Sequence, residues 1–203
     1  MNFLAHLLLA GDEPEAITGA LLGDFVKGRL HKIKPAELRH GIMLHRKIDV
    51  FTDAHALTLI SRNRFSGNLR RYAGIVVDLA YDHFLATKWT SYCQTPLADF
   101  TTKVYRVLLA HRSSFEGRSL TVMERMTEQD WLGGYVSRDN VGSALAAISR
   151  RLSRPNPLAR CELQLANAYA GLEEDFASFF PELVAYVAQT QAGRTSTSSQ
   201  TQA

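Results

Sequence analysis

The stretch Ile75-Val-Val-Asp-Leu-Ala-Tyr-Asp-His-Phe-Leu85 places two carboxylates, Asp78 and Asp82, inside a strongly apolar run. Residues four apart project from the same face of a helix, and the apolar neighbours of these acids put them on the stripe that faces the core. Two buried like charges repel each other and lose hydration, at a cost of several kcal/mol per ion. A fold that buries them therefore needs a metal ion or a matched base, and His83 beside Asp82 offers a nitrogen ligand.

A second helical segment repeats this pattern upstream. In residues 38–49, His45 and Asp49 stand four apart on a stripe shared with Leu38 and Ile42. An imidazole nitrogen and a carboxylate oxygen at this spacing can bind one ion from a single helix face. Two such pairs on two helices predict a shared metal centre inside a helical bundle.

Two further candidate ligands lie in the first 25 residues. His6 lies on a short apolar helix, where it is either a ligand or a hydrogen-bonded core residue. Asp24 follows Gly23 at a helix end, where it either reaches an active site or caps the turn locally. Nitrogen and oxygen donors without a thiolate suit manganese, iron, magnesium or a catalytic zinc.

The two acids of the first stretch leave alternatives open. They could instead belong to a buried salt-bridge network with Arg46, Arg70 or Arg71. Asp82 and His83 also point about 100° apart on a helical wheel. Both can therefore bind one ion only if it lies between their directions, and otherwise one of them orients a ligand instead.

The composition is that of an ordinary globular domain. The chain has 203 residues, of which 46% are hydrophobic and 21% are charged. Its two cysteines, Cys93 and Cys161, form neither a disulfide framework nor a zinc–thiolate site, which favours a reducing compartment. Residues 1–10 lack the basic start of a signal peptide, and no run reaches the roughly 18 apolar residues of a membrane span. We therefore expect a cytoplasmic protein with no membrane contact.

Helical periodicity dominates the chain and predicts an all-α, single-domain helical bundle over residues 1–191. Pro181 is expected to break a long helix that begins near Leu158. Residues 192–203 are rich in Ser, Thr and Gln and predict a disordered tail. The predicted helices cover residues 2–10, 12–22, 35–53, 56–64, 70–92, 96–111, a segment from 119, 130–135, 140–152, 158–180 and 181–191.

The net charge of +3 is mild, but the basic residues are segregated. Residues 27–47 contain seven basic residues and one acid, and residues 62–71 and 150–160 each contain four arginines and no acid. Such segregation indicates an acidic partner or a phosphate ligand, the alternative being solvated helix faces. No nucleic-acid-binding motif is present. The chain also lacks a Walker loop, a dinucleotide-binding glycine loop and a nucleophile elbow, so phosphate handling would depend on metal and arginine.

Four motifs together resemble the bacterial acyl carrier protein phosphodiesterase family. They are Met1-Asn-Phe-Leu-Ala-His6; Gly23-Asp-Phe-Val-Lys-Gly28; Gly41-Ile-Met-Leu-His-Arg-Lys-Ile-Asp49 with Thr52-Asp53; and Asp78 with Asp82-His-Phe84. The resemblance implies a helical fold distantly like that of the HD phosphohydrolases, although this chain has the order Asp82-His83 where that superfamily has His-Asp. It also implies hydrolysis of the 4′-phosphopantetheine arm from holo-acyl carrier protein, with manganese as the favoured ion.

The resemblance and the spacing together suggest roles for particular residues. Asp24, Arg46 and His83 are the catalytic candidates, with Arg46 placed to stabilise phosphoryl charge. Lys27 and Arg29 are expected near the mouth of the site, where the acidic carrier protein would dock. The metal-ligand candidates are Asp24, His45, Asp49, Asp78, Asp82 and His6.

Two other functions are compatible with the sequence. A nucleotide phosphohydrolase of the HD type would use the same metal site but accept free nucleotides. A non-enzymatic helical adaptor would use only the basic faces, and it predicts that no metal is bound. The oligomeric state does not follow from the sequence.

Overall fold

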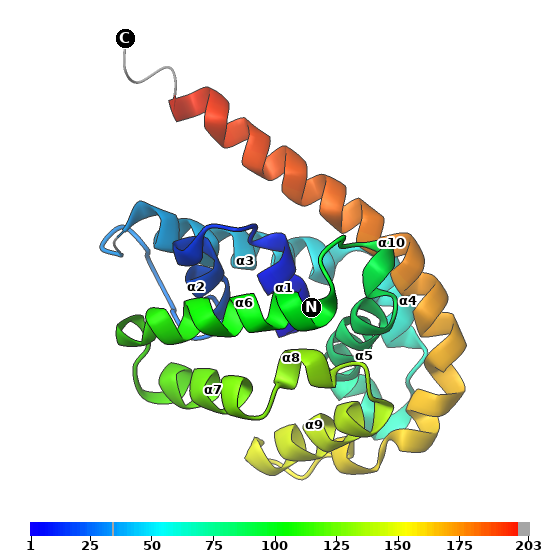
Figure 1. Cartoon of the computed structure of the whole chain (residues 1–203). Helices are drawn as coiled ribbons and strands as arrows, with labels where there is room; N and C mark the ends of the chain where they lie inside the picture. The colour runs from blue at the N-terminus through cyan, green and yellow to red at the C-terminus, as the bar shows by residue number, and fades with distance from the viewer. Residues whose placement is uncertain (34, 199–203) are drawn as a thin grey trace.

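The structure is a computed structural model that describes residues 1–33 and 35–198, and it confirms the all-α class. Within that part of the chain no β-strand occurs. Ten α-helices and four 3-10 helices are present there (Figure 1). The α-helices are α1 (Phe3–Leu9), α2 (Pro14–Leu22), α3 (Ala36–Ala54), α4 (Ala56–Asn63), α5 (Ala73–Thr87), α6 (Leu97–Ala110), α7 (Gly117–Glu128), α8 (Trp131–Gly134), α9 (Arg138–Arg151) and α10 (Glu162–Ser198). The 3-10 helices are η1 (Gly67–Tyr72), η2 (Trp89–Ser91), η3 (Arg112–Ser114) and η4 (Leu158–Arg160).

The helix that carries Asp78 and Asp82, α5, forms the centre of the molecule. It packs against α1, α4, α9 and α10, so it is buried on several sides rather than along one stripe. A helix that is apolar nearly all round is typical of such a central position. The single helix predicted over residues 70–92 is instead η1, α5 and η2 in succession.

Helices α2 and α3 approach each other closely at two glycines. A Cβ atom on Gly19 would lie 2.3 Å from the carbonyl oxygen of Leu38, and one on Gly41 would lie 2.3 Å from that of Ala16. The backbones can therefore touch only because both positions lack a side chain. This contact fixes α3, and with it His45 and Asp49, against the end of α2.

The C-terminal helix is longer than the sequence predicts. Pro181 lies inside α10, which changes direction along its course but continues (Figure 1). Phe180 and Leu183 are fully buried on either side of the proline, and this packing compensates for the backbone hydrogen bond that a proline cannot donate. Residues 192–198 extend the same helix, because adding residues to a formed helix costs little. The rest of the predicted tail, residues 199–203, lies outside the described residues.

Among the described helices, none is both long enough and apolar enough to cross a membrane.

Candidate metal centre

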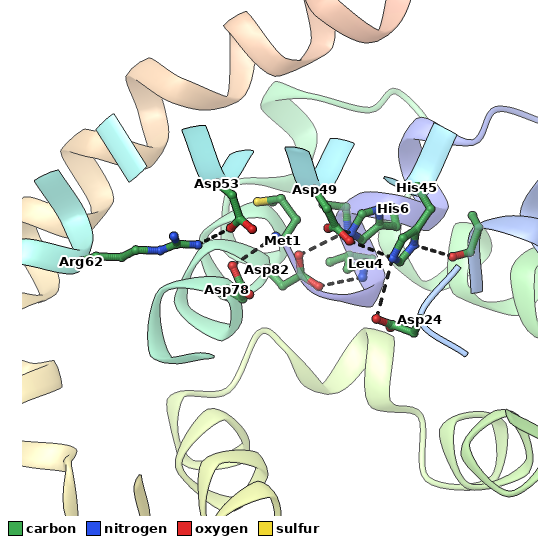
Figure 2. Close-up of polar contacts among 12 residues, drawn as sticks. Met1, Leu4, His6, Asp24, His45, Asp49, Asp53, Arg62, Asp78 and Asp82 are labelled. Atoms are coloured by element: carbon green, nitrogen blue, oxygen red, sulfur yellow. Dashed lines mark hydrogen bonds and ion pairs between the residues drawn. The ribbon is translucent and has the colours of Figure 1, made fainter. Parts of the chain in front are cut away.

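Four side chains from α1, α3 and the end of α2 converge at one point (Figure 2). Asp49 Oδ1 lies 3.1 Å from His6 Nε2, and Asp49 Oδ2 lies 3.2 Å from His45 Nε2. Asp24 Oδ1 is 3.7 Å from the same His45 nitrogen. Within the described part of the chain, His6, His45 and Asp49 form a group whose ligand atoms all lie within 4.8 Å of one another.

His45 is oriented as metal-binding histidines usually are. Its ring is buried, and Nδ1 lies 2.7 Å from the carbonyl oxygen of Ala20. Because a carbonyl can only accept, Nδ1 carries a proton, and Nε2 faces Asp49 and Asp24. An imidazole nitrogen that faces two carboxylates needs a cation between them, which is either a proton on Nε2 or a metal ion.

Gly23 makes this orientation possible, since a Cβ atom there would lie 2.2 Å from Cγ of His45. We expect Gly23→Ala to displace the imidazole of His45 and to lower phosphodiesterase activity about 10²-fold, because a misplacement of a catalytic group by about 1 Å has an effect of this size. Gly142→Ala on α9, where a Cβ atom meets open space, is the matched control and should keep full activity. Steady-state kinetics of the two variants measure the difference, and equal rates would contradict it.

His6 completes the group as a buried base without a hydrogen bond. Neither ring nitrogen has a hydrogen-bond partner, since Nε2 is close to Asp49 but not aligned with it. Burial, together with the neighbouring His45, lowers the pKa of His6 to about 3, so its ring is neutral. The His6 and His45 rings are stacked with centroids 3.8 Å apart, an arrangement that disfavours charge on both.

The pKa values of the two carboxyl groups of the site are shifted in opposite directions. Burial raises the pKa of Asp49, but the imidazole groups of His45 and His6 that face this carboxylate outweigh it and hold that pKa well below its usual range. Burial raises the pKa of Asp24, partly opposed by His45. Orphaned imidazole nitrogens facing an ionised carboxylate, without any thiolate, fit a divalent cation such as manganese, iron, zinc or magnesium.

Asp78 and Asp82 lie outside this group and have other partners (Figure 2). The oxygens of Asp82 accept the backbone N–H groups of Leu4 and Ala5, at 2.7 and 3.3 Å. Asp78 Oδ1 lies 3.1 Å from the amino group of Met1. Asp82 thus satisfies unpaired N–H groups in the first turn of α1, and the two acids together hold in place the helix that carries His6. Within the described part of the chain, none of Arg46, Arg70 and Arg71 bonds to these acids, so the alternative of an arginine network is not observed.

The other two catalytic candidates are also engaged elsewhere. His83 Nδ1 lies 2.7 Å from the carbonyl oxygen of Tyr135, and its Nε2 lies 2.9 Å from the hydroxyl of Tyr169. Arg46 donates to the carbonyl oxygens of Val26 and Gly28, and so fixes the segment that follows Asp24. The same segment carries Lys27 and Arg29, both exposed.

Asp24 also lies in the wall of a cleft of about 720 Å³. The start of α1 and helices α7, α8 and α9 supply most of the remaining wall, which includes four arginines. Two of these, Arg118 and Arg125, are missing from the sequence-based candidates. Arg118 and Arg125 are seven residues apart and so share one face of α7, and this spacing could have indicated a basic helix face.

Comparison with known proteins agrees with these observations. Residues 1–183 match the family model described as acyl carrier protein phosphodiesterase. A protein of that name from Yersinia pestis is 32% identical over 91% of this chain and 96% of its own length. One from Salmonella paratyphi A is 33% identical over 93% and 98%, and one from Klebsiella pneumoniae is 32% identical over 91% and 96%. No solved structure matches this chain. The resemblance noted in the sequence is thereby confirmed, and the chain belongs to the acyl carrier protein phosphodiesterase family.

Proposed function

We propose that this protein is a metal-dependent phosphodiesterase. It would hydrolyse holo-acyl carrier protein to apo-acyl carrier protein and 4′-phosphopantetheine. The observation that carries the proposal is the cluster of His6, His45 and Asp49 in a chain of this family. Asp24, beside this cluster, lines the cleft. The function also gives an acidic partner to some of the segregated basic residues, among them Lys27 and Arg29 in the segment after Asp24. A cytoplasmic location remains a prediction of the sequence.

The ligand set we propose is His6, His45 and Asp49, with Asp24 completing it or acting beside it. The predicted ligation by Asp78 and Asp82 has less support, because backbone N–H groups and the Met1 amino group occupy their oxygens. We propose Mn²⁺ as the ion, with Mg²⁺, Fe²⁺ and Zn²⁺ as competitors for the same donors. When bound, such an ion polarises a phosphoryl oxygen and lowers the pKa of a coordinated water.

The residues of the chain would divide the remaining work. His45, whose ring is held by the carbonyl oxygen of Ala20, would fix the position of the ion and thereby the side from which water attacks the phosphodiester. Asp24 lies between His45 and the cleft, where its carboxyl group can take a proton from the attacking water or give one to the serine oxygen that leaves phosphorus. Arg46 would act by positioning the segment after Asp24 rather than by touching the phosphoryl group.

The test is incubation of the protein with holo-acyl carrier protein and Mn²⁺, followed by intact mass measurement of the carrier. We expect the carrier to lose the mass of its phosphopantetheine arm. An unchanged mass with a folded, metal-loaded protein would contradict the proposal. Phosphate release from free nucleotides would favour a nucleotide phosphohydrolase, and a protein that binds no metal would favour the adaptor.

A further inference from the structure

The cleft next to Asp24 has a basic rim and an apolar wall. Arg118 and Arg125 extend into its lining from α7, and Arg150 and Arg151 do so from the last turn of α9. The wall between them is largely apolar and includes Phe3, Leu79, Val122, Trp131 and Ile148. Figure 1 shows α7 and α9 below α1 and α6, with α8 between them along the chain.

The four arginines have no acidic partner within the described residues. None of their side chains takes part in an ion pair or a hydrogen bond there, although all four residues are exposed. Partial burial, and then the charges of Arg118 and Arg125, lower the pKa of Arg151, so α7 and α9 bring these three charges close together. Asp130 also lines the cleft, but it accepts hydrogen bonds from Tyr105 and Gly133.

Neighbouring basic residues behave differently. Arg112, which precedes α7, pairs with Glu124 at 2.6 Å, and Lys88 pairs with Glu173 at 2.9 Å. A concave surface that collects four unpaired cations raises the local concentration of anions. The arrangement of the cleft therefore indicates an anionic ligand that comes from outside the chain.

We propose that this cleft docks the protein substrate, with the arginines binding carboxylates on an acidic surface and the apolar wall receiving the prosthetic arm. The inference rests on the proposed function and adds the surface by which the carrier protein is recognised. The position of Asp24 supports this docking surface. Asp24 lines the cleft, and its Oδ1 also lies 3.7 Å from Nε2 of His45. An arm lying along the wall would thus lead to the metal centre. Lys27 and Arg29, exposed in the segment after Asp24, would extend the basic rim.

Charge reversal tests the docking surface. We expect the double variant Arg118→Glu/Arg125→Glu to weaken the affinity for holo-acyl carrier protein at least about tenfold, because each 1.4 kcal/mol of lost binding is a factor of ten. Calorimetric titration of the metal-free protein with the carrier measures this affinity independently of turnover. Wild-type affinity should also fall as salt is raised, and that dependence should be weaker in the variant.

Arg154→Glu/Arg160→Glu is the matched control, since it changes the net charge equally at two exposed arginines outside the cleft lining. It should bind the carrier like the wild type. Equal affinities of the two double variants, or a wild type that does not bind the carrier, would overturn the docking surface. The melting temperature and the Mn²⁺ affinity of each variant separate this result from misfolding or a damaged metal centre. If the carrier binds at the cleft but its mass does not change, the proposed hydrolytic function is contradicted and the proposed docking surface is supported.

Discussion

Replacing His45 with alanine should remove the metal ion and lower phosphodiesterase activity by about 10³-fold or more, the upper range for losing one preorganised stabilising group. The reason is geometric. The carbonyl oxygen of Ala20 fixes the ring from one side, so Nε2 can only face Asp49 and Asp24. Without this nitrogen, the ion loses one of the three donors of the group, and among the described residues only Asp24 is close enough to replace it.

Mn²⁺ titration calorimetry and elemental analysis measure the loss of metal, and kinetics with the carrier protein measure the loss of activity. Because His45 is buried, Asp49→Asn provides a second variant at a half-exposed position that the fold should tolerate. Added Mn²⁺ should raise the melting temperature of the wild type, as any ligand specific to the native state does, but not that of either variant. His31→Ala, at an exposed histidine, is the control. Full metal content and activity in both site variants would rule out this centre.

The helices could be predicted because their cause is local. Apolar spacing and Pro35 placed α3 within one or two residues of its observed bounds, Ala36–Ala54. Pro181 was one exception, since its local effect is opposed by packing from elsewhere, including the buried Phe180 and Leu183. Tertiary packing of this kind cannot be predicted from the spacing of apolar residues along a helix.

The site likewise contains residues whose pairing follows from local spacing and residues that only the fold brings together. His45 and Asp49 share a face of one helix, so their spacing was sufficient to pair them. The contact of His6 with Asp49 joins residues far apart in sequence, and only the fold brings them together. The predicted burial is confirmed for Asp82, which is fully buried, but not for Asp78, whose side chain is 33% exposed. The compensating charge came from backbone N–H groups and an amino group, which no side-chain pattern reveals.

Asp82→Ala should therefore destabilise the protein by about 2–5 kcal/mol, because it leaves the N–H groups of Leu4 and Ala5 buried without an acceptor. It should also weaken Mn²⁺ binding, since a loosened α1 no longer holds His6 beside Asp49. Asp53→Ala is the matched control. It removes an exposed carboxylate paired with Arg62 and should cost less than about 1 kcal/mol. Urea denaturation and metal titration measure both effects, and equal stabilities of the two variants would exclude a structural role for Asp82.

The pH dependence of stability offers an independent test of the same buried group. Burial raises the pKa of Asp82 from 3.8 to about 7, although the Met1 amino group and the N–H groups of Leu4 and Ala5 oppose this shift. The native carboxyl group thus keeps a proton that the unfolded chain loses near pH 4. The native state then binds more protons between about pH 4 and 7, so stability must fall as the pH rises through that window.

Asp82→Asn should remove this slope, because the amide stays neutral at every pH. In the metal-free protein, we expect the free energy of unfolding of the variant to increase relative to that of the wild type between pH 4 and pH 8. The gain should be at most about 4 kcal/mol, since each unit of pKa shift corresponds to about 1.4 kcal/mol. Urea denaturation of both proteins at several pH values measures the difference in the free energy of unfolding. A difference that does not change with pH would mean that Asp82 is ionised in the native state throughout, with the start of α1 compensating its charge in full.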